Sequence, residues 1–200
     1  MKEVNNMKEP IFYKIVRFIV RILMFLIYHP TVIGKENIPK QGSFVLAGNH
    51  TNALDPVALV AINKRCVHFL AKDSLYKGWK KVLFKGMAII PVNRKIHDKE
   101  ALVNANKVLT NGGVIGVFPE GTINRTKDVI MPFKIGAVKM ASDTNSPIVP
   151  FTITGKYKPF SSNVVIRFEK PYKVSDSDLD KENDKLMKIV SNNIIKSRRK

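Results

Sequence analysis

Residues 43–62 read Ser43-Phe44-Val45-Leu46-Ala47-Gly48-Asn49-His50-Thr51-Asn52-Ala53-Leu54-Asp55-Pro56-Val57-Ala58-Leu59-Val60-Ala61-Ile62. The apolar run that ends at Gly48 predicts a short buried strand, because glycine followed by asparagine is typical of a strand end. Pro56 and the apolar residues after it predict the first turns of a helix, since proline is well tolerated at the first helical position. His50 therefore lies on the turn that leaves a strand, and Asp55 lies at or just before a helix start.

The pairing of His50 with Asp55 has two interpretations. A loop that bends into a helix lets the Asp55 carboxylate reach back to the imidazole. An aspartate bonded to one ring nitrogen leaves the other nitrogen free to accept a proton, so His50 would be a general base. In the alternative, Asp55 is a helix N-cap and His50 an ordinary polar turn residue.

The rest of the chain predicts strands that alternate with helices. Such alternation is typical of a single α/β domain with a mixed, largely parallel sheet flanked by helices. We expect further strands at 31–38, 67–71, within 86–94, and at 114–118, 148–154 and 164–168. We expect further helices at 11–28, 75–84, 98–109, 134–141 and 181–195.

The amino-acid composition limits the kinds of molecule that the protein is expected to bind. The 34 Lys and Arg residues against 16 Asp and Glu residues give a formal net charge of +18. Such a positive field favours nucleic acid, anionic lipid headgroups or phosphate-bearing substrates. A single cysteine, Cys66, excludes an internal disulfide. The four histidines lack the spacing of metal ligands, so we expect no metal site.

The segment Ile11 to Tyr28 is mostly apolar but carries Lys14, Arg17 and Arg21, three and four residues apart. A membrane-spanning helix needs about 20 nearly uncharged residues, and no plausible signal-peptide cleavage site follows this segment. We therefore expect residues 1–30 to be an amphipathic membrane-associated segment and residues 31–200 to be the main domain. The basic residues would contact anionic headgroups, while Leu23, Phe25 and Leu26 would enter the acyl boundary. The alternative is a helix that packs against the core at the edge of the domain.

Polar residues follow three of the predicted strands: Asn49 to Asp55, Asn93-Arg94, and Glu120-Gly121-Thr122. Ligand sites in open α/β sheets gather outside the carboxyl ends of the strands. The guanidinium of Arg94 can bind a phosphate bidentately, and a glycine lets backbone approach a ligand closely. Each of these polar segments, taken alone, could also be an ordinary turn or a charged side chain in solvent. The sequence has neither a Walker-type phosphate loop nor the Gly-x-Ser-x-Gly turn of serine hydrolases.

Together, four ordered segments resemble the motifs of the glycerolipid acyltransferases typified by bacterial 1-acyl-glycerol-3-phosphate acyltransferase. The matching segments are Asn49 to Asp55 (Asn-His-x-x-x-x-Asp), Gly86 to Arg94, Phe118 to Thr122 (Phe-Pro-Glu-Gly-Thr) and Ile148 to Phe151. The resemblance covers roughly residues 32–168 and implies that residues 31–200 form an acyltransferase domain.

The resemblance implies acyl transfer from an acyl-carrier-protein or coenzyme A thioester to the sn-2 hydroxyl of lysophosphatidic acid, which forms phosphatidic acid. His50 would take the hydroxyl proton and Asp55 would orient and stabilise the imidazolium. The alkoxide would attack the thioester directly, so no acyl-enzyme and no cofactor besides the acyl donor are expected.

The acceptor phosphate site implied by the resemblance comprises Arg94, Glu120, Gly121 and Thr122, with further cations at Lys72 and Arg125. Glu120 would orient Arg94 or another cation, because a carboxylate cannot itself bind a phosphate favourably. The chain departs from the family at Ile123, where many members have arginine. Arg125, two residues later, is a candidate to replace it.

Two other functions stay open. One keeps the chemistry but changes the acceptor to another lysophospholipid or an ornithine-type lipid. The other is a non-catalytic basic module that binds a membrane or nucleic acid. No nucleic-acid-binding motif is recognisable, and aromatic residues make up 8% of the chain, so we expect no nucleic-acid partner. The expected location is the cytoplasmic face of the cell membrane, as a peripheral or monotopic protein.

Overall fold

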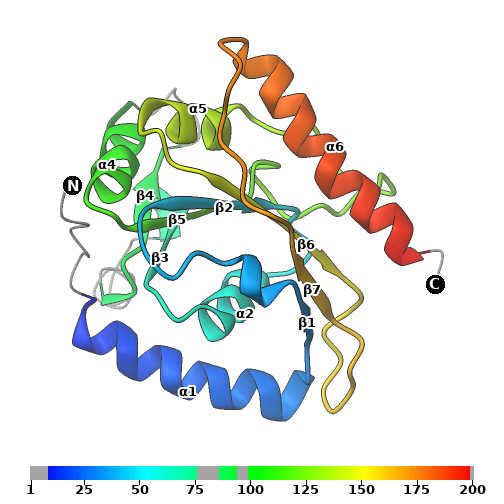
Figure 1. The fold of residues 1–200 in the computed structure, drawn as a ribbon. Helices are drawn as coiled ribbons and strands as arrows, with labels where there is room; N and C mark the ends of the chain where they lie inside the picture. The colour runs from blue at the N-terminus through cyan, green and yellow to red at the C-terminus, as the bar shows by residue number, and fades with distance from the viewer. Residues whose placement is uncertain (1–8, 76–85, 94–98, 199–200) are drawn as a thin grey trace.

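The computed structural model describes residues 9–75, 86–93 and 99–198 as one seven-stranded sheet between two layers of helices (Figure 1). The strands are β1 (Thr31–Ile33), β2 (Phe44–Gly48), β3 (Val67–Lys72), β4 (Ile90–Val92), β5 (Val114–Val117), β6 (Ile148–Thr154) and β7 (Val165–Phe168). The helices are α1 (Ile11–Tyr28), α2 (Asp55–Ile62), α4 (Lys99–Thr110), α5 (Gly136–Asp143) and α6 (Leu179–Arg198), with 3-10 turns η1 (Lys35–Asn37) and η2 (Asp73–Leu75).

The strand order in the sheet is β1-β7-β6-β2-β5-β3-β4. β6 and β7 are antiparallel, and all other neighbouring strands are parallel. The prediction of a mixed, largely parallel sheet is therefore confirmed. Because β2, β3, β5 and β6 run in one direction, the loops that follow them emerge at the same edge of the sheet, where ligand sites are expected.

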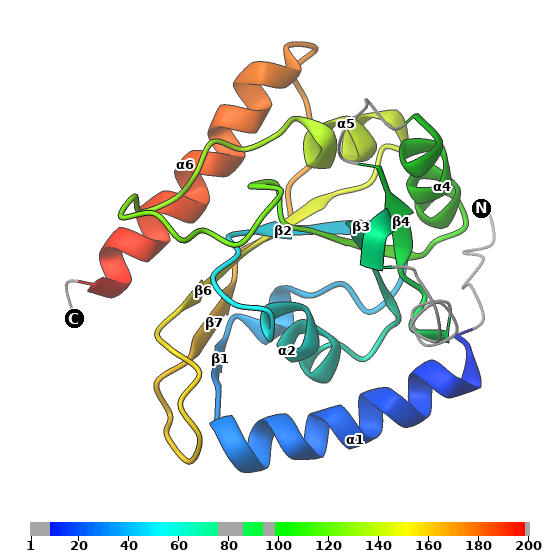
Figure 2. The same ribbon diagram turned by 180° about the vertical axis from the view of Figure 1, so that it is seen from behind.

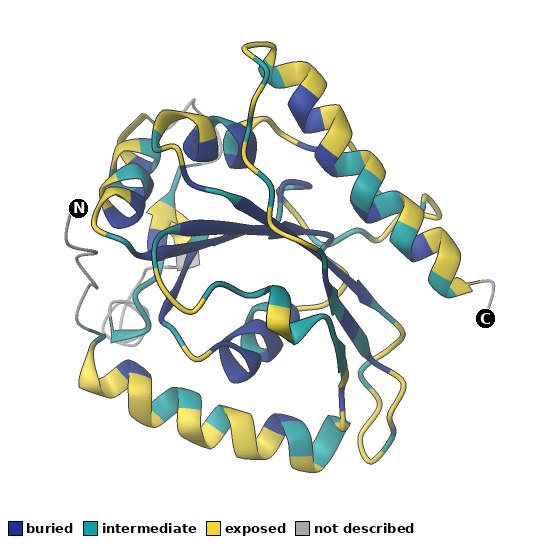
Figure 3. Ribbon diagram, in the orientation of Figure 1, coloured by how far each residue is buried: buried dark blue, intermediate teal, exposed yellow. Residues whose placement is uncertain are grey.

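Helices cover both faces of the sheet: α1 and α2 lie on one side, and α4, α5 and α6 on the other (Figures 1 and 2). The central strand β2 is buried along its whole length, as Figure 3 shows. Its side chains alternate, so that Phe44 and Leu46 join the core beneath α2 while Val45 and Ala47 join the core beneath α5 and α6.

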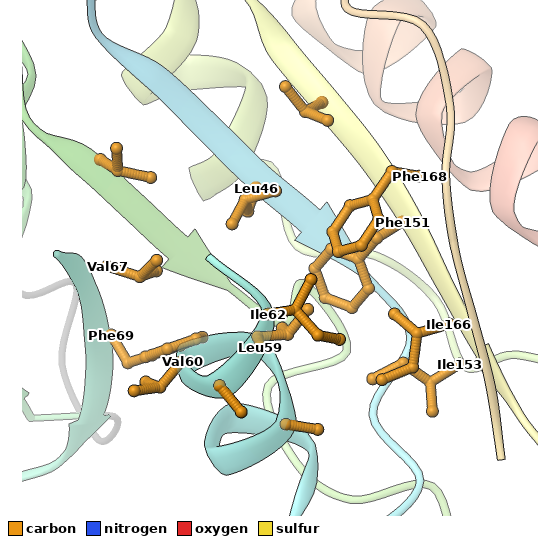
Figure 4. Close-up of a cluster of buried hydrophobic side chains, with 14 of the residues drawn as sticks. Leu46, Leu59, Val60, Ile62, Val67, Phe69, Phe151, Ile153, Ile166 and Phe168 are labelled. Atoms are coloured by element: carbon orange, nitrogen blue, oxygen red, sulfur yellow. The ribbon is translucent and has the colours of Figure 1, made fainter. Parts of the chain in front are cut away.

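The core beneath α2 fixes where that helix begins. Leu59 and Ile62 of α2 pack against Phe151 and Phe168 of the sheet, and all four side chains are almost completely buried (Figure 4). Full burial of each such side chain contributes about 1.5–3 kcal/mol. This packing holds α2 against the sheet and so fixes the position of Asp55, its first residue.

The first helix has the predicted bounds, and it packs against the domain on one side only. Tyr13 and Met24 are buried, and the Tyr13 hydroxyl accepts a hydrogen bond from the Val67 backbone N–H at 2.9 Å. Phe25, expected to face lipid, instead packs against the core. The other side carries exposed apolar side chains: Ile11, Phe12, Ile15, Phe18, Ile19, Ile22, Leu23 and Leu26. Among the described residues, no helix is both long enough and apolar enough to cross a bilayer.

Some element bounds differ from the predictions. The expected strand at 31–38 ends at Ile33, because Gly34 adopts a left-handed φ of +71° and the chain turns into η1. The strand expected within 86–94 is the short edge strand β4, in which Ile90 is buried but Pro91 is exposed; proline is tolerated at a sheet edge.

Helix bounds differ as well. Helix α5 begins at Gly136 rather than at Lys134, and α6 extends beyond the predicted 181–195 at both ends. Lys134 lies outside the helix, and its backbone N–H donates to the Pro119 carbonyl at 2.9 Å. Most of the helix expected at 75–84 lies outside the described residues.

Candidate active site

His50 and Asp55 meet at the carboxyl end of β2. His50 Nδ1 lies 3.0 Å from Asp55 Oδ2. The Asp55 side chain is completely buried, whereas 16% of the His50 side chain is exposed. Since Nδ1 faces the carboxylate, Nε2 is the ring nitrogen left for a substrate proton.

The Asp55 carboxylate reaches backward into the turn. Its Oδ2 also accepts the backbone N–H groups of Thr51 at 2.6 Å and Asn52 at 2.8 Å. Asp55 is itself the first helical residue, and no side chain caps the start of α2. The alternative in which Asp55 is an ordinary helix N-cap is therefore wrong, and the carboxylate instead shapes the turn that carries His50.

Aromatic stacking fixes the plane of the imidazole. The Phe118 ring stacks on His50 with the ring centroids 4.1 Å apart and the planes inclined by 20°. Phe118 in turn contacts the rings of Phe69 and Phe151, at centroid distances of 5.9 Å and 5.7 Å. The His50 imidazole thus stacks on an aromatic ring that is itself packed in the core.

Glu120 joins the loop of His50 to a second loop. Its Oε1 accepts the His50 backbone N–H at 2.7 Å, and its Oε2 accepts the Met131 N–H at 2.8 Å. Burial is the largest influence on this carboxyl and raises its pKa, although both N–H donors oppose that effect. The carboxylate thus braces the backbone of His50. Arg94, the cation that Glu120 was expected to orient, lies outside the described residues.

Two asparagines hold the same turn from other sides. Asn49 exchanges two hydrogen bonds of 2.8 Å with the backbone of Ile153 in β6. The Asn124 N–H donates to the His50 carbonyl at 2.8 Å. At Gly48 a Cβ atom would lie 2.2 Å from the Phe151 carbonyl oxygen, so glycine is required where β2 and β6 approach each other.

Not all of the residues expected to bind the acceptor phosphate lie next to His50. Gly121 directly follows Glu120 and adopts a left-handed φ of +73°. Thr122 and Arg125 are exposed on the same loop, and Lys72 is exposed at the end of β3. The structure therefore joins Glu120 to His50 and Asp55 and leaves Lys72 and Arg125 on the surrounding surface.

Lys134 is a neighbour of this site that the sequence did not reveal. A Cβ atom placed on Gly121 would lie 3.1 Å from the Lys134 Cε and Nζ atoms, so the side chain lies across the glycine. Among the described residues, no carboxylate forms an ion pair with Lys134. In the sequence Lys134 was part of a predicted helix, and no local pattern distinguished it from other lysines.

In the part of the chain that the structure describes, no three His, Cys, Asp or Glu side chains gather as metal ligands. The described residues of the site supply a carboxylate-oriented imidazole with lysines nearby.

A protein-family model described as acyltransferase matches residues 29–154, from the end of α1 to the end of β6. The chain belongs to the acyltransferase family. The match includes His50, Asp55 and Glu120 with the loops that hold them.

Two curated members of the acyltransferase family are similar to this chain, and both are named 1-acyl-sn-glycerol-3-phosphate acyltransferase. The protein from Borreliella burgdorferi is 37% identical over 137 residues, which cover 67% of this chain and 54% of that protein. The protein from Bacillus subtilis is 31% identical over 145 residues, which cover 72% of this chain and 71% of that protein. The chain thus spans about half the length of the first relative.

The crystal structure of the 1-acyl-sn-glycerophosphate acyltransferase from Thermotoga maritima has the same fold. It aligns with a TM-score of 0.73 and 22% sequence identity, and the alignment covers 94% of this chain and 80% of that chain. This likeness extends over the sheet and both helical layers.

Proposed function

We propose that the protein transfers an acyl group from a thioester to the sn-2 hydroxyl of 1-acyl-glycerol-3-phosphate, which forms phosphatidic acid. The observation that carries this proposal is the imidazole of His50, held 3.0 Å from a fully buried Asp55 at the carboxyl edge of the sheet. The names of the two relatives support the choice of acceptor.

In the proposed reaction, Nε2 of His50 accepts the proton of the acceptor hydroxyl while Asp55 stabilises the imidazolium. The alkoxide oxygen attacks the thioester carbonyl carbon and forms a tetrahedral intermediate. Its collapse breaks the carbon–sulfur bond, and the departing thiolate takes the proton from the imidazolium. No acyl-enzyme is needed, because the acceptor oxygen itself attacks the donor.

The acceptor phosphate needs cations close to His50. We propose that Lys134 supplies one, because its side chain crosses Gly121, and Gly121 follows the residue that binds the His50 backbone. This lysine offers a charge near the place where Ile123 replaces the arginine of many family members. Arg94 and Lys72 remain candidates for the other phosphate contacts, since a phosphate is usually held by more than one donor.

The acyl donor is proposed to be an acyl-carrier-protein or coenzyme A thioester. Both carry negative charge, and the net charge of +18 favours the approach of either. No cofactor besides this thioester is required by the proposed chemistry.

We further propose that the protein binds the cytoplasmic face of the membrane through a membrane-facing surface, formed by the exposed apolar residues of α1 together with Phe160. Phe160 is 79% exposed in the loop between β6 and β7, and its N–H donates to the Ile27 carbonyl at 2.5 Å. Figures 1 and 2 both show this loop beside the carboxyl end of α1. Lipid is the favoured partner because the acceptor carries an acyl chain, and because Lys14 on α1 and Lys156 and Lys158 in the β6–β7 loop are exposed.

The basic residues of α1 differ in their surroundings. Lys14 and Arg21 are exposed, as anionic headgroups would require. Arg17 instead forms an ion pair with Glu9 at 3.0 Å and donates to the Lys64 carbonyl at 2.7 Å. Of the three expected headgroup contacts, Lys14 and Arg21 are the two that we retain.

The test is an assay of purified protein with 1-acyl-glycerol-3-phosphate and both kinds of thioester, with phosphatidic acid as the measured product. The proposal expects product with at least one donor. Product only with another lysophospholipid or an ornithine-type lipid would change the acceptor, and no transfer with any of them would favour a non-catalytic basic module.

A further inference from the structure

The two oxygens of the Asp55 carboxylate have unequal surroundings. Oδ2 receives His50 Nδ1 and the backbone N–H groups of Thr51 and Asn52, all within 3.0 Å. Within the described residues, Oδ1 has one hydrogen-bonding neighbour, the Thr51 hydroxyl at 3.4 Å, which is long for a hydrogen bond between oxygens. A fully buried carboxylate usually has donors on both oxygens, because unmet buried charge is costly.

A buried hydroxyl without a partner among the described residues lies in the loop after β6, which packs against the core that holds α2. The Tyr157 hydroxyl is buried and completes no hydrogen bond of normal geometry. Burial and the adjacent charge of Asp55 both raise the pKa of Tyr157, so the phenol keeps its proton and can only donate to the carboxylate. Asp55 Oδ1 can accept another hydrogen bond, and the Tyr157 hydroxyl has one to donate.

The fold explains how a residue 102 positions after Asp55 comes to lie there. Strands β2 and β6 are parallel neighbours, so the loop after β6 emerges at the same edge as the loop after β2. Tyr157 lies in that loop, close to the site, and packs against the core beneath α2.

The last residue of α1 packs against the ring of Tyr157. Tyr28, the last residue of α1, meets the Tyr157 ring edge-on, with the centroids 5.6 Å apart and the planes at 89°. The hydrogen bond from Phe160 to Ile27 ties the same loop to the same helix end. Residues of α1, of the β6–β7 loop and of the β2–α2 turn are thus in continuous contact.

We propose that Tyr157 is a positioning residue of the catalytic site: its hydroxyl donates to Asp55 Oδ1, and Tyr28 of α1 holds it in place. This hydrogen bond locks the carboxylate plane and draws some negative charge away from Oδ2, the oxygen that faces His50. Among the described residues, the titratable groups around the imidazole are then Asp55 from α2, Glu120 from the loop after β5, Lys134 across Gly121, and Tyr157 with the adjacent Tyr28.

The proposal is tested by Tyr157→Phe, which removes the hydroxyl and keeps the ring. The ring titration of His50 is followed by NMR on the ligand-free protein, so this measurement does not depend on any substrate. Without the donor, Asp55 holds the imidazolium more strongly, so the midpoint of the titration should rise relative to that of the wild type.

Tyr172→Phe is the matched control. Tyr172 also has a buried hydroxyl that finds no partner in the described parts of the chain, but this residue packs against the core beneath α5 and α6. Its loss should leave the His50 titration unchanged. Equal midpoints for Tyr157→Phe, Tyr172→Phe and the wild type would overturn the proposal.

A second variant, Tyr28→Leu, keeps apolar bulk but removes the ring edge that supports Tyr157. It should move the midpoint of the His50 titration in the same direction by a smaller amount. An unchanged midpoint would show that α1 has no part in positioning Tyr157.

A kinetic measurement, which rests on the proposed function, tests the same residue. Tyr157→Phe should shift the acid limb of the pH profile of kcat/KM to higher pH and leave KM for the acceptor unchanged. If the NMR midpoint moves while no acyl transfer is found, the proposed function fails and the positioning role stands.

Discussion

The imidazole of His50 is held by three residues from two separate parts of the chain. Asp55 binds the ring nitrogen, Phe118 stacks on the ring face, and Glu120 accepts the backbone N–H. Each contact restrains a different degree of freedom of the residue. In the proposed reaction, a general base that is fixed in this way would meet the acceptor hydroxyl without first having to adopt the reactive orientation.

Asp55→Asn tests the orienting carboxylate. The amide can keep one oxygen acceptor, but it loses the negative charge that stabilises the imidazolium, so kcat should fall by about a hundredfold or more. The N–H donors of Thr51 and Asn52 then face a weaker acceptor, so the free energy of unfolding should also fall, by about 1–3 kcal/mol. Denaturant unfolding measured beside kcat separates the two effects, and a variant with wild-type kcat would remove Asp55 from the mechanism.

Lys134→Gln tests the proposed phosphate contact across Gly121. Loss of the charge should raise KM for 1-acyl-glycerol-3-phosphate by about three- to tenfold, with little change in kcat. The control is Lys139→Gln on α5, where the lysine pairs with Asp143 at 3.2 Å. If both substitutions raised KM equally, Lys134 would act only through the overall positive charge of the protein and not through a direct phosphate contact.

At the scale of elements, α1 and β3 stabilise each other. Tyr13 binds the first residue of β3, and Cys66 immediately precedes that strand in the same buried cluster. Burial is the main cause that raises the pKa of the Cys66 thiol to about 12. The thiol is therefore protonated and shielded in the folded protein.

This burial predicts how the single cysteine behaves. The thiol ionises in the unfolded chain at about pH 8.5 but not in the folded one, so its contribution to stability is lost as the pH rises from about 8.5 toward 12. The free energy of unfolding of the wild type should thus fall faster over this range than that of Cys66→Ala. A thiol reagent should label Cys66 only after unfolding, and rapid labelling of the native protein would contradict the packing of α1.

What could be predicted from the sequence depended on how local each contact is. The strand, turn and helix around His50 follow from adjacent residues, and the helix at 11–28 from its own apolar pattern. Tyr157 and Lys134 could not be predicted, because their neighbours in the site are more than ten residues away along the chain and meet them only through the strand order. The early end of β1 depends on the left-handed Gly34, which apolar patterning does not reveal.

At the scale of the whole molecule, the proposed membrane-facing surface lies along α1 and the β6–β7 loop. Deletion of residues 1–28 would remove Tyr13 and Met24 from the core, so it would test stability as much as membrane binding. Substitution of exposed residues separates the two effects. Phe18 is 67% exposed and Leu26 is 60% exposed, so both can be changed without loss of core packing.

Phe18→Ser combined with Leu26→Ser should shift the protein from sedimenting with anionic vesicles toward the supernatant, because less apolar surface enters the acyl boundary. Val103→Ser on α4 is the control, since Val103 is 50% exposed on the opposite helical layer. Activity of the double variant should fall more on vesicle-bound acceptor than on detergent-dispersed acceptor. Sedimentation equal to that of the control would place the membrane contact elsewhere.

The central claim is that His50 acts as the base in acyl transfer to 1-acyl-glycerol-3-phosphate. The most direct measurement compares phosphatidic acid formation by the purified wild type and by His50→Ala, with the same thioester and acceptor. The imidazole is partly exposed and the turn is held mainly through backbone contacts, so the variant should keep its unfolding transition and its binding to vesicles. The account predicts that its product formation falls to the level without protein, whereas substantial phosphatidic acid from folded His50→Ala would contradict it.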